Sequence, residues 1–287
     1  MIVRQLNSSD VDQARAMWIT RFDDSPSFVN WYFDNRFLPE YSFGSFDNGE
    51  LLSISHGYPT RVRTADGIVP ALMISGVSTK QGHEHKGYMH RVITAQMEYA
   101  HQRDIPLAFN KPVNINTYTS LGFVPCTDAL FFHADRISVA PCKLIAHDYR
   151  VMSELYANIM RNYFGSIVRE EAAFAFKMED YLSDDAKIVM SQDGYAVYFV
   201  RDNEVYVDEM LCSNDYLPLL CAIIQKEKLP LSAKLPPDLD LQGEVRPMCV
   251  FAATDQNECT TEELQRKLGY ITAKGSKSRQ CFCIEEY

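Results

Sequence analysis

One segment constrains the fold of this chain more than any other. Between residues 71 and 101, an apolar run is followed by a polar turn with glycines and then by an amphipathic stretch. The apolar run, residues 71–77, predicts a buried strand. A mostly apolar stripe recurs at helical spacing from Met89 to Ala100, so a helix is predicted from Gly87 onward. A second apolar run at residues 105–109 completes a β-α-β unit.

The turn before this helix predicts an anion site. The first N–H groups of a helix lack intrahelical partners, and the helix dipole favours negative charge beside them. A phosphate-bearing cofactor is the guest we expect, and Gly87 would let the backbone approach it closely. The alternative is a glycine that only begins a helix and meets no ligand.

Composition excludes several classes of function. The chain has 287 residues, enough for one large or two ordinary domains, and a net charge of −10 that argues against a nucleic-acid partner. We expect no membrane partner either, and a cytoplasmic protein, because no apolar run reaches membrane-spanning length and the N-terminus lacks a signal core. The eight cysteines form no C-x-x-C pair, and we expect no metal. The histidines of the turn are expected to be solvated rather than ligands: His83, His85 and His90.

The remaining patterns place this unit in a longer order of elements. In the N-terminal half we expect a strand at 1–6, helices from Asn7 and Ser25, and extended segments at 41–46, 51–55 and 62–72. With the β-α-β unit the order is β-α-α-β-β-β-α-β, and a last strand is expected at 129–133. The second half predicts a helix from Asp148, a three-strand meander over 186–211, a helix at 217–224, and a tail with a strand, a helix at 261–268 and a terminal strand at 280–287.

This order resembles the GNAT fold of acetyl-CoA-dependent N-acetyltransferases. Residues 118–123, Tyr-Thr-Ser-Leu-Gly-Phe, are similar to the family's Tyr-x-x-(Leu/Phe)-Gly-Phe segment. Residues 18–23 and the aromatic segment 28–36 resemble the enhanced-intracellular-survival (Eis-like) subfamily. The resemblance implies an α/β fold with mixed sheets: a GNAT domain at residues 1–138, then a second, degenerate GNAT-like lobe at 139–287. The tail is too short for the third domain of such relatives.

The resemblance also implies a coenzyme A site in the N-terminal lobe. Val77 and Ser78 would meet the pantetheine arm, and the turn would hold the pyrophosphate through residues Glu84, His85, Lys86, Gly87, Tyr88 and Met89. Glu84 departs from the family, which carries Arg or Gln there. A carboxylate about 4 Å from a phosphate costs about 1–4 kcal/mol. Lys80, Lys86 or protonated turn histidines could offset this cost, or Glu84 could point away.

Catalytic and acceptor residues follow from the same resemblance. Tyr118 is implied as the general acid that protonates the coenzyme A thiolate, with a packing tyrosine as the alternative. Eis-like relatives use their terminal carboxylate, here that of Tyr287. Trp31, Tyr32 and Asp34 suit a wall for a cationic amine, although core packing explains each aromatic ring equally. The general base stays open among Asp23, Asp24, Asp34, Glu40 and Glu84.

The function expected from these residues is transfer of an acetyl group from acetyl-CoA by direct attack of an amine. The acceptor would be a small-molecule amine or a lysine-type peptide amine. The alternatives are a non-catalytic or CoA-binding regulatory module with a degenerate cofactor site, marked by Glu84, and an acyltransferase that takes a longer acyl-CoA. The oligomeric state stays open, a homo-oligomer included.

Overall fold

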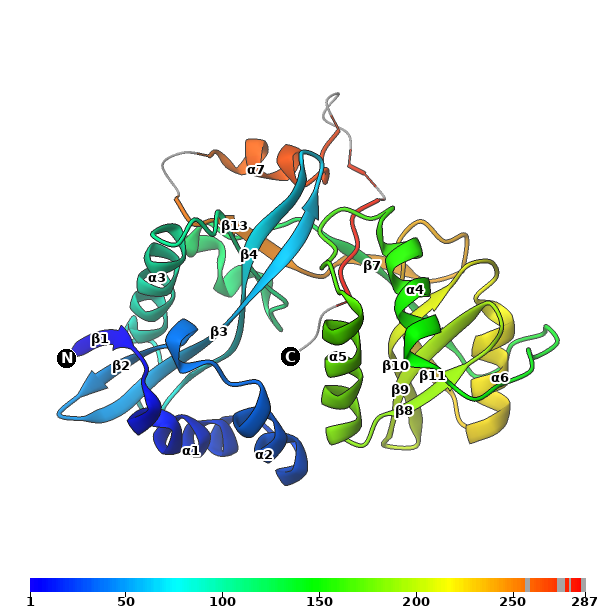
Figure 1. Cartoon of the computed structure of the whole chain (residues 1–287), viewed down its shortest axis with the longest axis horizontal. Helices are drawn as coiled ribbons and strands as arrows, with labels where there is room; N and C mark the ends of the chain where they lie inside the picture. The colour runs from blue at the N-terminus through cyan, green and yellow to red at the C-terminus, as the bar shows by residue number, and fades with distance from the viewer. Residues whose placement is uncertain (256–258, 273–276, 279, 285–287) are drawn as a thin grey trace. The chain divides into compact units, whose positions relative to one another are not determined.

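The chain forms two compact units, each with its own mixed β-sheet (Figure 1). The computed structural model describes residues 1–255, 259–272, 277–278 and 280–284. The first unit comprises residues 1–126 and 249–267, and the second comprises residues 127–248 and the described part of 268–286. The expected α/β class with mixed sheets is confirmed.

The first unit is built on a seven-stranded sheet. Only β4 and β5 run parallel, and every other neighbouring pair in this sheet is antiparallel. The strands, in their order across the sheet, are β1 (Ile2–Gln5), β2 (Phe43–Asp47), β3 (Glu50–Thr64), β4 (Gly67–Thr79), β5 (Leu107–Asn110), β13 (Val250–Ala253) and β6 (Val124–Pro125).

Helices cover both faces of this sheet (Figure 1). Side chains alternate between the faces of a strand, and on β3 Ile54 packs against the first two helices whereas Ser55 donates a hydrogen bond to Gln96 of the third. One face therefore carries α1 and α2, and the other carries α3. The helices of this unit are α1 (Val11–Arg21), α2 (Pro26–Asn35), α3 (Tyr88–His101) and α7 (Thr261–Lys267).

The strands β4 and β5 pair over a short distance and then separate. Their parallel register runs only from Ala71 to Met73 on β4, although β4 continues to Thr79. Among the described residues, no strand pairs with residues 74–79 on the β5 side. Backbone N–H and C=O groups are obligatory hydrogen-bonding groups. This stretch of β4 therefore presents a free strand edge within the sheet.

The second unit repeats the pattern of a mixed sheet between helices. Apolar residues of α6 pack against this sheet in one hydrophobic cluster. Phe174 of α5 packs edge-on against Tyr195 of β9. The strands, in their order across the sheet, are β12 (Glu244–Pro247), β7 (Asp128–Ala134), β11 (Leu231–Leu235), β10 (Glu204–Cys212), β9 (Gly194–Arg201) and β8 (Lys187–Met190), and the helices are α4 (Tyr149–Met160), α5 (Glu171–Ser183) and α6 (Leu217–Glu227).

Two strands, β7 and β13, belong to a different sheet from the one that their position along the chain suggests. The strand expected at 129–133 to end the N-terminal lobe is β7, and it pairs with β11 and β12 in the second sheet. Its expected place in the first sheet is taken by β13, which is fully buried at Val250 and stacks Phe251 on Phe109 of β5. The boundary expected between residues 138 and 139 therefore does not coincide with the compact units.

Most expected elements are present, and the differences are the short strands β6, β11 and β12, the helix α5 and the expected terminal strand. The helix α5 was not expected, because its buried side includes Lys177 and Asp180, which interrupt the apolar stripe and pair with each other at 2.7 Å. A terminal strand is expected at 280–287. Its described residues, 280–284, form an isolated bridge between Cys281 and Phe164. The remaining residues of that expectation lie outside the described part of the chain.

Candidate functional site

The turn between β4 and α3 has the geometry expected of an anion site. Gly87 is the residue before the helix and adopts a φ of 76°, in the left-handed region where glycine is favoured. No side chain caps the helix there. The N–H groups of the first turn of α3 are thus free of the capping side chain that usually takes one of them.

A pocket of about 510 Å³ lies at this turn. It is lined by the end of β4, the turn itself and the start of α3, and also by residues at the end of α1 and in the segment after β5. The predicted cofactor residues that line it are Val77, Ser78, Glu84, His85, Gly87, Tyr88 and Met89. Lys86 is not among the lining residues, and its Nζ donates to the carbonyl of Gly82 at 2.9 Å. The structure therefore brings together all but one of these residues.

Two polar atoms at the pocket are buried without a hydrogen-bond partner in the described part of the chain. They are Oγ of Ser78, a residue that is only 8% exposed, and Nδ1 of His83. Buried polar groups in folded proteins are nearly always paired, by protein, water or a ligand. These two atoms are therefore available to form a hydrogen bond with a polar ligand at the pocket wall.

Glu84 does not point away from the turn but takes part in its structure. Its carboxylate accepts a hydrogen bond from the Gly82 N–H at 2.7 Å and pairs with Arg21 at 3.2 Å. The N–H groups of Glu84 itself and of Gly82, followed by Arg21, lower the pKa of this carboxyl. Glu84 is thus ionised, and a cation from the end of α1 lies against it. Lys80, considered above as a compensating charge, pairs with Glu50.

Tyr118 lies next to the pocket, in the apolar cluster that also includes Val77 and Met89. Its ring packs edge-on against Phe123 with 5.7 Å between the centroids, while Thr117 and Ser120 on either side of it line the pocket. Burial raises the pKa of Tyr118 to about 12, so its hydroxyl is protonated at neutral pH. Packing and the proposed acid role are compatible, because the ring provides the packing and the protonated hydroxyl would provide the proton.

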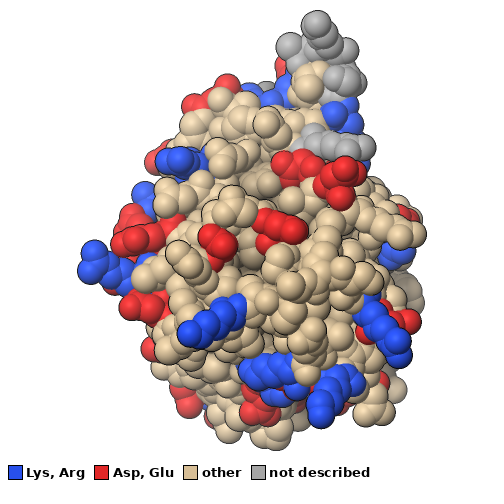
Figure 2. All heavy atoms as spheres, turned by 90° about the vertical axis from the view of Figure 1, so that its right-hand side faces the viewer, with Lys and Arg blue, Asp and Glu red and all other residues tan. Residues whose placement is uncertain are grey.

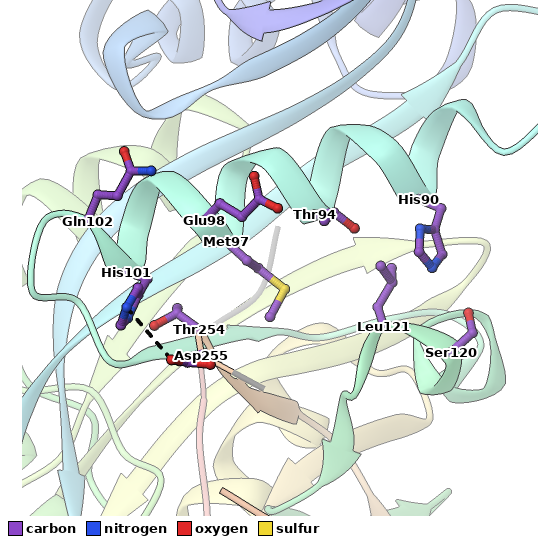
Figure 3. Close-up of a pocket in the computed structure, with 10 residues that line it drawn as sticks. All are labelled: His90, Thr94, Met97, Glu98, His101, Gln102, Ser120, Leu121, Thr254 and Asp255. Carbon is purple, nitrogen blue, oxygen red and sulfur yellow. Dashed lines mark ion pairs between the residues drawn. The ribbon is translucent and has the colours of Figure 1, made fainter. Parts of the chain in front are cut away.

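A second pocket continues from the first along α3 (Figure 3). It has a volume of about 470 Å³, and it shares His90 and Ser120 with the pocket at the turn. At its other end, His101 and Asp255 lie 3.8 Å apart. The two pockets are thus neighbours, and the second follows one side of α3.

The aromatic helix α2 lies in the core rather than around the pocket. Tyr32 is 3% exposed and shares a hydrogen bond of 2.8 Å with Nδ1 of His56, a buried histidine on β3 that the sequence did not single out. Trp31 packs at the margin of the same cluster, and the exposed Asp34 pairs with Arg15 at 2.7 Å. None of the predicted acceptor residues lines the pocket at the turn. Their role as an acceptor wall stays a prediction.

Among the acidic candidates for the general base, only Glu84 lines the pocket. Tyr287, whose terminal carboxylate was the other catalytic expectation, lies outside the described residues. Sequence reasoning missed Arg21, Phe22, Thr117 and Ser120, all of which line the pocket. No local pattern marks them, since they come from α1 and from the segment after β5 and meet the turn only in the fold.

The described residues contain no group of three His, Cys, Asp or Glu side chains placed to hold a metal ion. In the same part of the chain, no helix combines the length and apolarity needed to cross a bilayer.

Figure 2 shows the face that bears α6, where Lys and Arg lie interspersed with Asp and Glu among uncharged residues.

Comparisons with known proteins agree with this geometry. Residues 2–126 match the family model described as "Acetyltransferase (GNAT) domain". A search of curated proteins gave no match. Among solved structures, similarity extends to a conserved protein of unknown function from Enterococcus faecalis, with a TM-score of 0.72 and 13% identity over 89% of this chain and 73% of that one.

Two further solved structures are similar over nearly the same share of the chain. Eis1 from Mycobacterium abscessus has a TM-score of 0.66 and 16% identity, covering 89% of this chain and 74% of its own. A GCN5-related N-acetyltransferase from Kribbella flavida has a TM-score of 0.66 and 16% identity, covering 87% of this chain and 70% of its own. At these identities the likeness concerns the fold. Residues 2–126, which carry the pocket at the turn, therefore match a GNAT acetyltransferase domain.

Proposed function

We propose that this protein transfers an acetyl group from acetyl-CoA to an amine, in the manner of the Eis-like acetyltransferases. The observation that carries the proposal is the free edge of β4 from residue 74 to 79, which leads into a pocket at the N-terminus of α3. An extended chain with amide groups can pair with such an edge, as peptides do in β-augmentation. If this extended chain carried phosphates at its far end, they would reach the helix N-terminus. Acetyl-CoA has an amide-bearing pantetheine arm followed by phosphates, which is this order.

The residues of the pocket divide between these parts of the cofactor. Val77 and Ser78, at the end of β4, suit the pantetheine arm, and the buried Oγ of Ser78 offers it a hydrogen bond. Gly87, Tyr88 and Met89 offer backbone N–H groups to the pyrophosphate. GNAT acetyltransferases generally use acetyl-CoA, which supports this cofactor for residues 2–126.

Tyr118 is the general acid in this proposal. When the amine attacks the thioester carbon, backbone N–H groups near Val77 stabilise the oxyanion, and the carbon–sulfur bond then breaks. The leaving thiolate takes a proton from the tyrosine hydroxyl, which is supplied in its protonated form because its pKa is raised to about 12. Tyr118 packs in one cluster with Val77, which supports its nearness to the reacting thioester.

The acceptor in this proposal is a small-molecule amine or a lysine-type peptide amine. An alkylamine has a pKa near 10, so a base or water must remove its proton before attack. Glu84 accepts a hydrogen bond from Gly82 within the turn proposed for the pyrophosphate, which makes it a poor base for the amine. The net charge of −10 favours cationic acceptors through long-range attraction.

The experiment that tests this function is a screen of amines with acetyl-CoA as donor. The acetylated product is detected by mass spectrometry, and coenzyme A is detected by chromatography. A thiol reagent would be unsuitable, because the protein itself has eight free cysteines. We expect stoichiometric release of coenzyme A and acetylated amine. Acetyl-CoA that binds but is never turned over, with any amine, would point to the regulatory module instead.

A further inference from the structure

We propose that Arg21, the last residue of α1, is the cation that holds the phosphates of the cofactor in this protein. The inference rests on the proposed function and deepens it. The turn before α3 carries a glutamate at position 84, so it has no positive side chain there to meet a phosphate. The fold brings one to the same place from a different helix.

The position of Arg21 supports this role. Its side chain lines the pocket at the turn, together with Ser78 and Gly87, and is 31% exposed. Of the residues that line the pocket, Arg21 alone is an arginine or lysine, and a guanidinium group stays charged at every working pH. The lysines of the turn do not line the pocket: Lys80 pairs with Glu50, and Lys86 donates to the Gly82 carbonyl.

The pocket shows independently that it is built for a ligand. Oγ of Ser78 is buried and has no hydrogen-bond partner in the described chain, and Nδ1 of His83 is in the same condition. Both residues line the pocket on the side of β4 and the turn, whereas Arg21 enters from α1. An anion at the start of α3 would lie among these groups and the helix N–H groups.

Arg21 can move from Glu84 to a phosphate at little cost. The ion pair is a single contact of 3.2 Å between partly exposed side chains, and such pairs contribute little to stability. A phosphate offers more acceptor oxygens and accepts two parallel bonds from the guanidinium fork. Glu84 keeps the hydrogen bond from the Gly82 N–H, so the turn retains its shape when Arg21 leaves. Glu84 thus holds Arg21 ready beside the pocket and competes with the phosphate for it.

The test is calorimetric titration of the full chain with acetyl-CoA and with S-acetylpantetheine, which lacks the phosphates. Arg21→Ala should weaken acetyl-CoA binding about tenfold, the usual effect of losing one charge-assisted hydrogen bond, and leave S-acetylpantetheine unchanged. Arg21→Lys should recover part of the loss. The matched control is Arg15→Ala, because Arg15 lies on the same helix in a similar ion pair with Asp34 but does not line the pocket.

A second variant tests the competition. Glu84→Gln can still accept from the Gly82 N–H but no longer holds Arg21, so it should tighten acetyl-CoA binding, and by less in an Arg21→Ala background. The inference is overturned if the wild type binds acetyl-CoA and the Arg21→Ala variant binds it equally well. A wild type that does not bind acetyl-CoA at all would instead refute the proposed function, and this inference with it.

Discussion

A buried histidine beneath the first sheet should make the N-terminal unit sensitive to acid. His56 is 1% exposed and its ring lies among Trp18, Phe33 and Phe37, with 4.9 Å to the Phe37 centroid. Burial lowers the pKa of His56 from 6.5 to about 3. Its Nδ1 shares a hydrogen bond with Tyr32, whereas Nε2 is buried and has no partner in the described chain. Protonation would therefore place a charge in an apolar cluster.

The magnitude follows from the shift. Between pH 6.5 and 3 the unfolded chain binds the proton and the folded chain does not, so the free energy of unfolding falls as the pH falls below 6.5. The contribution of His56 is fully present above pH 6.5. At about 1.4 kcal/mol per pH unit, a solution at pH 4.5 should have lost about 3 kcal/mol of stability from this one group.

Urea unfolding followed by tryptophan fluorescence reports the loss of stability of the N-terminal unit. Both tryptophans of the chain, Trp18 and Trp31, lie on α1 and α2 of the N-terminal unit. We expect His56→Gln to be less stable at pH 7 but to lose less stability between pH 6.5 and 4.5. Tyr32→Phe keeps the buried imidazole and should keep the wild-type slope. Equal slopes for wild type and His56→Gln would refute the reasoning.

Three further predictions concern the site and the fold. Tyr118→Phe should lower kcat about 100-fold with little change in the Kd of acetyl-CoA, as steady-state kinetics and calorimetry would show; an unchanged kcat would remove its acid role. A fragment of residues 1–138 lacks β13 and should show no cooperative urea transition, which circular dichroism would test. Gly76→Ala places a Cβ 2.4 Å from Trp18 at a φ of 53° and should cost about 3 kcal/mol in urea unfolding; a wild-type midpoint would contradict this.

The sequence was most informative where structure is set locally. The periodicity from Met89 to Ala100 predicted α3 closely, and the glycine turn predicted the start of this helix at Gly87. Seven of the eight expected cofactor residues line one pocket because they follow one another along a single strand, turn and helix start. Such a segment needs no knowledge of the rest of the chain.

Long-range arrangements could not be predicted in the same way. Nothing in the short apolar segment of β13 indicates that it, rather than β7, lies between β5 and β6. The same limit applies to Arg21, whose pairing with Glu84 depends on how α1 packs on the sheet. The helix α2 illustrates a different limit: an aromatic face serves a core or a cleft equally well, and Tyr32 lies in the core because its hydroxyl finds His56 there.

The central claim is that the pocket at the turn before α3 binds acetyl-CoA, and calorimetric titration of the purified protein with acetyl-CoA tests it most directly. We predict binding of one acetyl-CoA per chain in the micromolar range, at the pocket beside the glycine turn of the first unit. No binding up to millimolar acetyl-CoA would contradict the account, and the GNAT fold of residues 2–126 would then describe the shape of this unit without its activity.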